Sequence, residues 1–78
     1  MNNFTLIIYR KGKEEFIEVE SFNINPLGEF INIYKRDKLN RRRLLTINFD
    51  AFSRMVIRKK DYRKFITIEG NLWKRLLH

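Results

Sequence analysis

The sequence predicts a small α+β domain. We expect a curled antiparallel sheet of four to six strands, with two N-terminal hairpins, closed by one or two short helices that include a C-terminal helix. Short segments of alternating apolar and polar residues fill most of the chain, which is the pattern of half-buried strands. Apolar residues at helical spacing recur only towards the C-terminus. Three glycines and one proline punctuate 78 residues, so the turns must be few and short.

Length and composition indicate one domain, residues 1–78. A chain of 9.6 kDa with 44% hydrophobic and 14% aromatic residues has a globular composition. Folding at this size buries roughly 60% of the unfolded surface. The sequence therefore supports one thin core.

The first predicted hairpin joins strands 4–10 and 14–22. Lys11-Gly12 forms a two-residue turn, because glycine accepts a positive φ. With Arg10 opposite Lys13, the two faces of the hairpin separate cleanly. One face carries Phe4, Leu6, Ile8, Ile17 and Val19, and the other carries Ile7, Tyr9 and Phe16. We expect this second apolar face to be covered by a helix containing Trp73 or by another subunit, as in a homodimer.

A second hairpin follows a turn at residues 23–28, which is rich in asparagine, proline and glycine. Its strands are predicted at residues 29–35 and 43–49, with a tip near residues 37–40. Both strands alternate apolar residues with polar ones.

The segment 50–63 fits two structures. Asp50 can cap a helix whose stripe contains Phe52, Met55 and Val56, and we predict this helix. The alternative is a strand over 55–59 paired with a strand over 64–68, which the β-branched residues favour. Residues 65–69 form a strand in either case, and Asn71 can cap the terminal helix.

Charge is distributed unevenly. Residues 1–34 have a net charge of −2 and residues 35–78 a net charge of +10. Such asymmetry is typical of proteins with a charged partner. Arginine and lysine form two clusters in the basic half. The first lies at the tip of the second hairpin and contains Lys35, Arg36, Lys38, Arg41, Arg42 and Arg43; the second contains Arg54, Arg58, Lys59, Lys60, Tyr62, Arg63 and Lys64.

The inventory of reactive side chains argues against catalysis. The chain has no cysteine, and its single histidine is His78, so thiolate metal sites and a histidine-based triad are not available. The glycines at 12, 28 and 70 are too dispersed for a phosphate-binding loop. We therefore predict a protein that is not an enzyme, with no catalytic residues, no metal site and no cofactor.

The charge pattern predicts a small basic protein that binds DNA or RNA through phosphate contacts, with the two clusters as the binding residues. The alternative is a phage-like module or inhibitor that binds an acidic or nucleic-acid-reading surface of a larger protein. The longest uncharged apolar runs are residues 4–9 and 44–49, far below the roughly 20 residues of a membrane helix. We therefore expect a cytoplasmic protein without membrane contact.

Overall fold

The computed structural model describes residues 3–60 and 65–72. This part of the chain contains seven strands and one short 3-10 helix. In chain order the elements are β1 (Phe4–Arg10), β2 (Lys13–Val19), β3 (Ser21–Ile24), β4 (Phe30–Arg36), β5 (Arg42–Asn48), η1 (Phe49–Ala51), β6 (Arg54–Lys59) and β7 (Phe65–Glu69).

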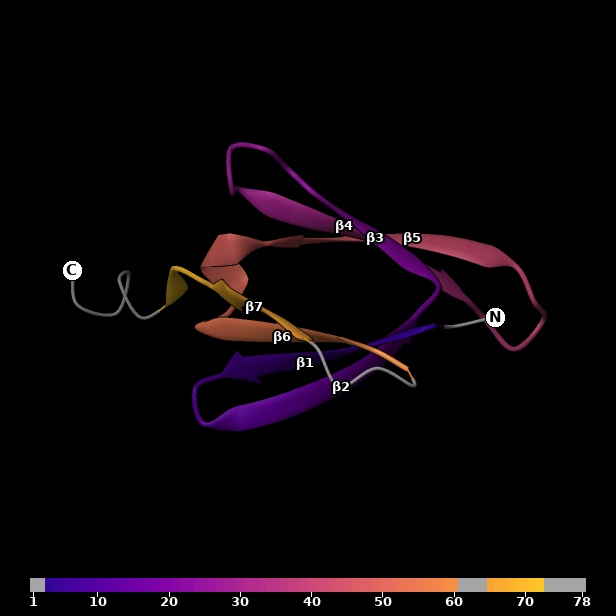
Figure 1. Cartoon of the computed structure of the whole chain (residues 1–78), viewed down its shortest axis with the longest axis horizontal. Coiled ribbons are helices and arrows are strands. Elements are labelled where there is room, and N and C mark those ends of the chain that lie inside the picture. The colour runs from indigo at the N-terminus through magenta and orange to yellow at the C-terminus, as the bar shows by residue number, and fades with distance from the viewer. Residues whose placement is uncertain (1–2, 61–64, 73–78) are drawn as a thin grey trace.

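The strands form two antiparallel sheets that face each other (Figure 1). The four-stranded sheet has the order β2-β1-β6-β7, and the three-stranded sheet has the order β3-β4-β5. The apolar core lies between them. Its fully enclosed members include Leu6 and Ile8 on β1, Ile31 and Ile33 on β4, and Phe52 after η1.

The predicted α+β class is wrong. The longest helix in the described residues is η1, with three residues. The predicted helix over 50–63 is also wrong, and its alternative is confirmed, because β6 pairs with β7 in antiparallel register. Met55 and Ile57 point into the core, opposite Ile8 and Leu6 of β1. The local sequence fits both a helix and a strand, and the pairing of β6 with β1 selects the strand. Beyond Leu72, the predicted C-terminal helix lies outside the described residues, as does Trp73.

The first hairpin has the predicted register, from Phe4 opposite Val19 to Arg10 opposite Lys13. Its second strand is shorter than predicted. β2 ends at Val19, and the chain then enters the other sheet as β3. At this corner the Glu20 backbone N–H donates a hydrogen bond to the Tyr34 carbonyl oxygen at 2.8 Å. Residues 14–22 therefore form parts of two strands and join the two sheets.

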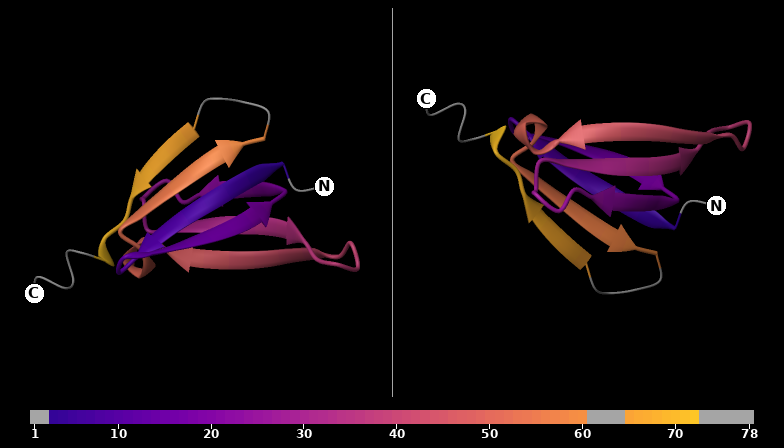
Figure 2. Two further views of the ribbon diagram at one scale, coloured as in Figure 1. Left: turned by 90° about the horizontal axis from the view of Figure 1, so that it is seen from below. Right: turned by 90° about the horizontal axis from the view of Figure 1, so that it is seen from above.

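The second hairpin is confirmed as β4 and β5, paired from Phe30 opposite Asn48 to Arg36 opposite Arg42. Its tip projects beyond the rest of the molecule (Figure 2). Asn40 occupies the left-handed region at this tip, with a φ of 60°, a conformation that asparagine tolerates better than most residues. The predicted place of the tip, near residues 37–40, is thus confirmed.

The opposite end of the core is closed by η1 and the residues after β7. The rings of Phe49 and Phe52 pack with centroids 5.5 Å apart. The chain returns over them at Gly70, whose N–H donates to the Ser53 carbonyl oxygen at 2.9 Å, and at Leu72, whose N–H donates to the Phe52 carbonyl oxygen at 3.1 Å. Among residues 3–60 and 65–72, we find no helix with the length and apolar character needed to cross a bilayer.

Gly70→Ala should destabilise the fold. A Cβ at this position would lie 2.0 Å from the Phe52 carbonyl oxygen and 2.6 Å from its ring. Backbone must move to relieve this overlap, so we expect a loss at the upper end of the roughly 1–3 kcal/mol that overpacking costs. Urea unfolding measures it. Stability equal to that of the wild type would contradict the close packing of β7's end on Phe52.

Candidate nucleic-acid interface

The tip of the β4–β5 hairpin is organised around one carboxylate. Asp37 Oδ1 accepts hydrogen bonds from the backbone N–H groups of Leu39 and Arg41, each at 2.9 Å. Asp37 Oδ2 accepts from Nε of Arg41 and from Nε of Arg43, each at 3.0 Å. A single acidic side chain thus shapes the loop and holds two guanidinium groups beside each other.

The arginines at this tip remain largely accessible. The side chains of Arg41, Arg42 and Arg43 are 58%, 53% and 55% exposed. Arg41 and Arg43 contact Asp37 through Nε, so their terminal nitrogens are available to a ligand. A guanidinium group in this state can form paired hydrogen bonds to phosphate oxygens.

A second set of contacts holds two arginines in place where the β4–β5 hairpin begins to extend beyond the rest of the protein. Arg36 Nε donates to Glu20 Oε2 at 2.6 Å, and its Nη1 donates to the Asn40 carbonyl oxygen at 3.2 Å. The guanidinium carbon of Arg42 lies 4.4 Å from the ring centroid of Tyr34. Such stacking orients the guanidinium plane and presents it together with an aromatic ring.

The same sheet face continues with uncharged side chains away from the tip. Registers place Ser21, Tyr34 and Leu44 in one row across the three strands, and Asn23, Asn32 and Thr46 in the next. Thr46 Oγ1 donates to Asn32 Oδ1 at 2.7 Å. We call the tip and this neighbouring surface the basic face, which comprises Tyr34, Lys35, Arg36, Lys38, Arg41, Arg42, Arg43 and Leu44. Tyr34, Arg36, Arg42 and Leu44 lie on the outer side of the hairpin, whereas Lys35 and Arg43 lie on the side that faces the other sheet.

The second predicted cluster lies on the other sheet. Arg54 and Arg58 share the outer face of β6, and the Arg54 guanidinium carbon lies 4.5 Å from the ring centroid of Tyr9. Lys60 Nζ lies 3.0 Å from Glu18 Oε2. Lys59 stands opposite Phe4 in the register of β1 and β6. The remaining predicted members, Tyr62, Arg63 and Lys64, lie outside the described residues.

The described members of the two clusters therefore lie on different sheets. Ion pairs on either side of the corner between β2 and β3 join Glu18 to Lys60 and Glu20 to Arg36. The local charge balance also differs between the two clusters. The basic face has six cations near two carboxylates, Glu20 and Asp37, whereas the described outer face of the four-stranded sheet has three cations near three carboxylates. Among the described residues, the basic face is therefore the stronger positive site.

Several residues of this interface, among them Tyr34 and Glu20, are not among the binding residues predicted from the sequence. The sequence predicts Tyr34 as an exposed apolar residue of a protein-binding patch, together with Ile7 and Phe16, and predicts Glu20 on a solvent-exposed strand face. Tyr34 could have been found once Arg36 and Arg42 were paired across the hairpin, because Tyr34 and Arg36 then lie on the same face of β4. Glu20 reaches Arg36 only because the chain turns from β2 into β3, and this turn depends on tertiary contacts.

Folding lowers the pKa of three carboxyl groups in this region. The hydrogen bond from Lys60 lowers the pKa of Glu18, the hydrogen bond from Arg36 lowers the pKa of Glu20, and the backbone N–H of Arg41 lowers the pKa of Asp37. Each group therefore binds its proton less tightly in the folded state. Their stabilising effect is complete above the unfolded pKa of about 4 and is lost as pH falls through the lower folded values.

Asp37→Asn should reveal this linkage. We expect the variant to be less stable than the wild type at pH 6.5 and the difference to shrink as pH is lowered below the unfolded carboxyl pKa of about 4 and through the lower pKa of the folded state. Urea unfolding of both proteins at each pH measures the difference. The repulsion among positive charges that grows at low pH acts on both proteins alike. A stability difference independent of pH would contradict the assigned role of the Asp37 carboxylate.

In the described ranges, no three acidic, histidine or cysteine side chains group as they would to bind a metal ion. The chain matches no known family model, no curated protein and no solved structure at a significant level. Any functional conclusion therefore depends on the geometry and charge of the chain itself.

Proposed function

We propose that this protein binds nucleic acid through the basic face, without catalysing a reaction. The observation that supports this most strongly is the hairpin tip, where six lysines and arginines project from the fold and the three consecutive arginines are each more than half exposed. Concentrated positive charge of this kind is repulsive in the free protein and is neutralised by phosphates.

The arrangement of the arginines favours phosphate as the ligand. Asp37 and Tyr34 restrain three guanidinium groups before any ligand arrives. Less side-chain freedom is then lost on binding, and the fork geometry suits phosphate oxygens. Asp37 and Glu20 neutralise only part of the local charge, so their main effect is to hold the cations in place.

The neighbouring sheet surface favours single-stranded nucleic acid. Tyr34 and Leu44 lie beside each other in the row next to the arginines, where unpaired bases could stack or pack. Sheet surfaces with aromatic residues and flanking cations are a common platform for single strands. The amide and hydroxyl groups of Asn32 and Thr46 lie one row further along.

The proposal is tested by fluorescence anisotropy with a labelled oligothymidylate of about 12 nucleotides. If all six cations contact phosphates, log K should fall against log salt with a slope of roughly −4 on the single strand, and of roughly −5 on a matched duplex. No binding to either at low salt, or an affinity insensitive to salt, would refute it. The alternative partner, an acidic protein surface, would then be the better explanation of the charge.

A further inference from the structure

The outer face of the four-stranded sheet has a pattern separate from the basic face. Its middle row, read across β2, β1, β6 and β7, consists of Phe16, Ile7, Val56 and Thr67. This row is apolar apart from the threonine at its end. The described residues leave it uncovered: Phe16 is 62% exposed. A second apolar sheet face was predicted from the sequence, with either a helix containing Trp73, which lies outside the described residues, or another subunit as its cover.

Charged residues flank this row in an ordered way. On one side lie Glu18, Thr5, Arg58 and Phe65, and on the other lie Glu14, Tyr9, Arg54 and Glu69. Two acidic groups, Glu14 and Glu18, therefore lie at the β2 edge, the arginines lie on β6, and Glu69 lies at the β7 edge. An apolar centre with a polar, charged rim is the usual anatomy of a protein–protein interface.

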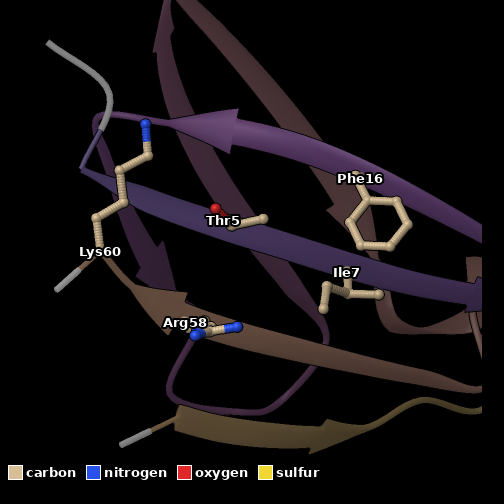
Figure 3. Close-up of a pocket in the computed structure, with 5 residues that line it drawn as sticks. All are labelled: Thr5, Ile7, Phe16, Arg58 and Lys60. Carbon is tan, nitrogen blue, oxygen red and sulfur yellow. The ribbon is translucent and has the colours of Figure 1, made fainter. Parts of the chain in front are cut away.

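Two shallow hollows open onto this face and share Ile7. One, of about 340 Å³, has Phe16 and Arg58 among its lining residues (Figure 3). The other, of about 400 Å³, is lined by Val56 and Phe65 as well. Figure 3 shows Ile7 and Phe16 side by side, with Arg58 and Lys60 at one end. The hollows suit small groups of apolar side chains from a partner surface.

We propose that this face binds the same face of a second copy of the chain, about a two-fold axis parallel to the strands. That axis lays β1 of one subunit over β6 of the other, so Ile7 meets the partner subunit's Val56. It also brings the β2 edge, with Glu18, over the edge that carries the partner subunit's Phe65 and Arg58. Phe16 then lies next to the partner subunit's Phe65.

The charge pattern selects this axis over the perpendicular one. An axis across the strands would place Glu14 against the partner subunit's Glu18, and Arg54 against the partner subunit's Arg58. Like charges facing each other in a buried contact are costly. An axis parallel to the strands leaves only one kind of like-charge contact, Glu14 against the partner subunit's Glu69, with the partner subunit's Arg54 beside it. It also brings Glu18 towards the partner subunit's Arg58 and permits the aligned packing common between sheets.

The size of the face limits the strength of the dimer. Four strands spaced about 4.8 Å apart, with about five residues each at about 3.3 Å, cover roughly 20 by 17 Å. Even allowing for surface relief, this is below the ~800 Å² per partner of a standard stable interface. We therefore expect a reversible dimer that dissociates in the micromolar to high-micromolar range.

Sedimentation velocity of the whole chain without nucleic acid tests the proposal, over about 10 µM to about 1 mM. The sedimentation coefficient should rise from the monomer value towards that of a dimer. Phe16→Glu should raise the dissociation constant at least tenfold, and Thr67→Glu on the same row serves as a second variant. Leu44→Glu is the matched control, because Leu44 is 61% exposed on the other sheet.

Three results would overturn the proposal. One is a wild-type monomer at every concentration. Another is a dimer that Leu44→Glu disrupts as strongly as Phe16→Glu does, with circular dichroism showing that both variants fold. The third is a dimer that both Phe16→Glu and Thr67→Glu leave intact. None of these outcomes depends on nucleic-acid binding, so this proposal and the proposed function can fail separately.

Discussion

Replacing Arg41, Arg42 and Arg43 together with alanine is expected to weaken binding to a single strand roughly 100-fold at 0.1 M salt, and binding to a duplex by roughly 500-fold. When a phosphate contact is lost, binding releases fewer counterions. At this salt concentration each contact contributes roughly five- to eightfold in affinity. The slope of log K against log salt should become shallower by roughly 2 on the single strand. Anisotropy titrations of the wild type and the variant measure both quantities.

A variant with the same change in net charge controls for long-range attraction. Replacing Arg54, Arg58 and Lys60 with alanine removes three cations from the other sheet. We expect this control to lose much less affinity, because those cations stand among Glu14, Glu18 and Glu69 on the outer face of that sheet. Equal losses in the two variants would mean that binding depends on overall charge and is not localised to the basic face.

Phe52→Ala should lower the free energy of unfolding by about 3–5 kcal/mol. The Phe52 ring is fully enclosed and packs against Phe49, and the backbone at Phe52 accepts the hydrogen bond from Leu72. Removing the ring leaves a cavity beside η1 and loosens the end of the core. A domain of this size has little stability in reserve, so part of the population should be unfolded at room temperature.

Urea unfolding followed by circular dichroism measures this loss. Phe16→Ala is the matched control: it removes the same ring from an exposed position, and we expect a change of about 0.5 kcal/mol or less. Phe52→Leu supplies an intermediate variant in case the alanine variant does not fold. A loss below about 1 kcal/mol for Phe52→Ala would contradict the enclosed position of this ring.

The sequence predicted the two hairpins because their determinants are local. Lys11 and Gly12 both have positive φ, 45° and 79°, so the two-residue turn fixes the register and strand alternation then assigns each face. At the second hairpin, alternating apolar residues and a polar tip were sufficient. The position of the first basic cluster followed from this hairpin, as the structure places all six of its members on or beside the tip.

The rest of the fold depends on contacts between distant segments. The inward-facing apolar residues have odd numbers in β2 (Ile17, Val19) and even numbers in β3 (Phe22, Ile24). This change of phase marks the passage from β2 to β3, where one long strand was predicted from the sequence. At residues 50–63, a helical stripe and a strand pattern coexist in the sequence. Pairing of Met55 and Ile57 with β1 decides between them, and no local propensity contains that information. The partnership of Glu20 with Arg36 was missed for the same reason.

Backbone amide chemical shifts, measured by NMR during a titration with oligothymidylate, locate the surface of the protein that binds nucleic acid. If the basic face is the binding site, the largest shifts should fall on the tip and its neighbours, from Tyr34 to Leu44, and the other sheet should be largely unaffected. Shifts centred on Ile7, Val56 and Arg54 of the four-stranded sheet, or no shifts at low salt, would contradict this binding site.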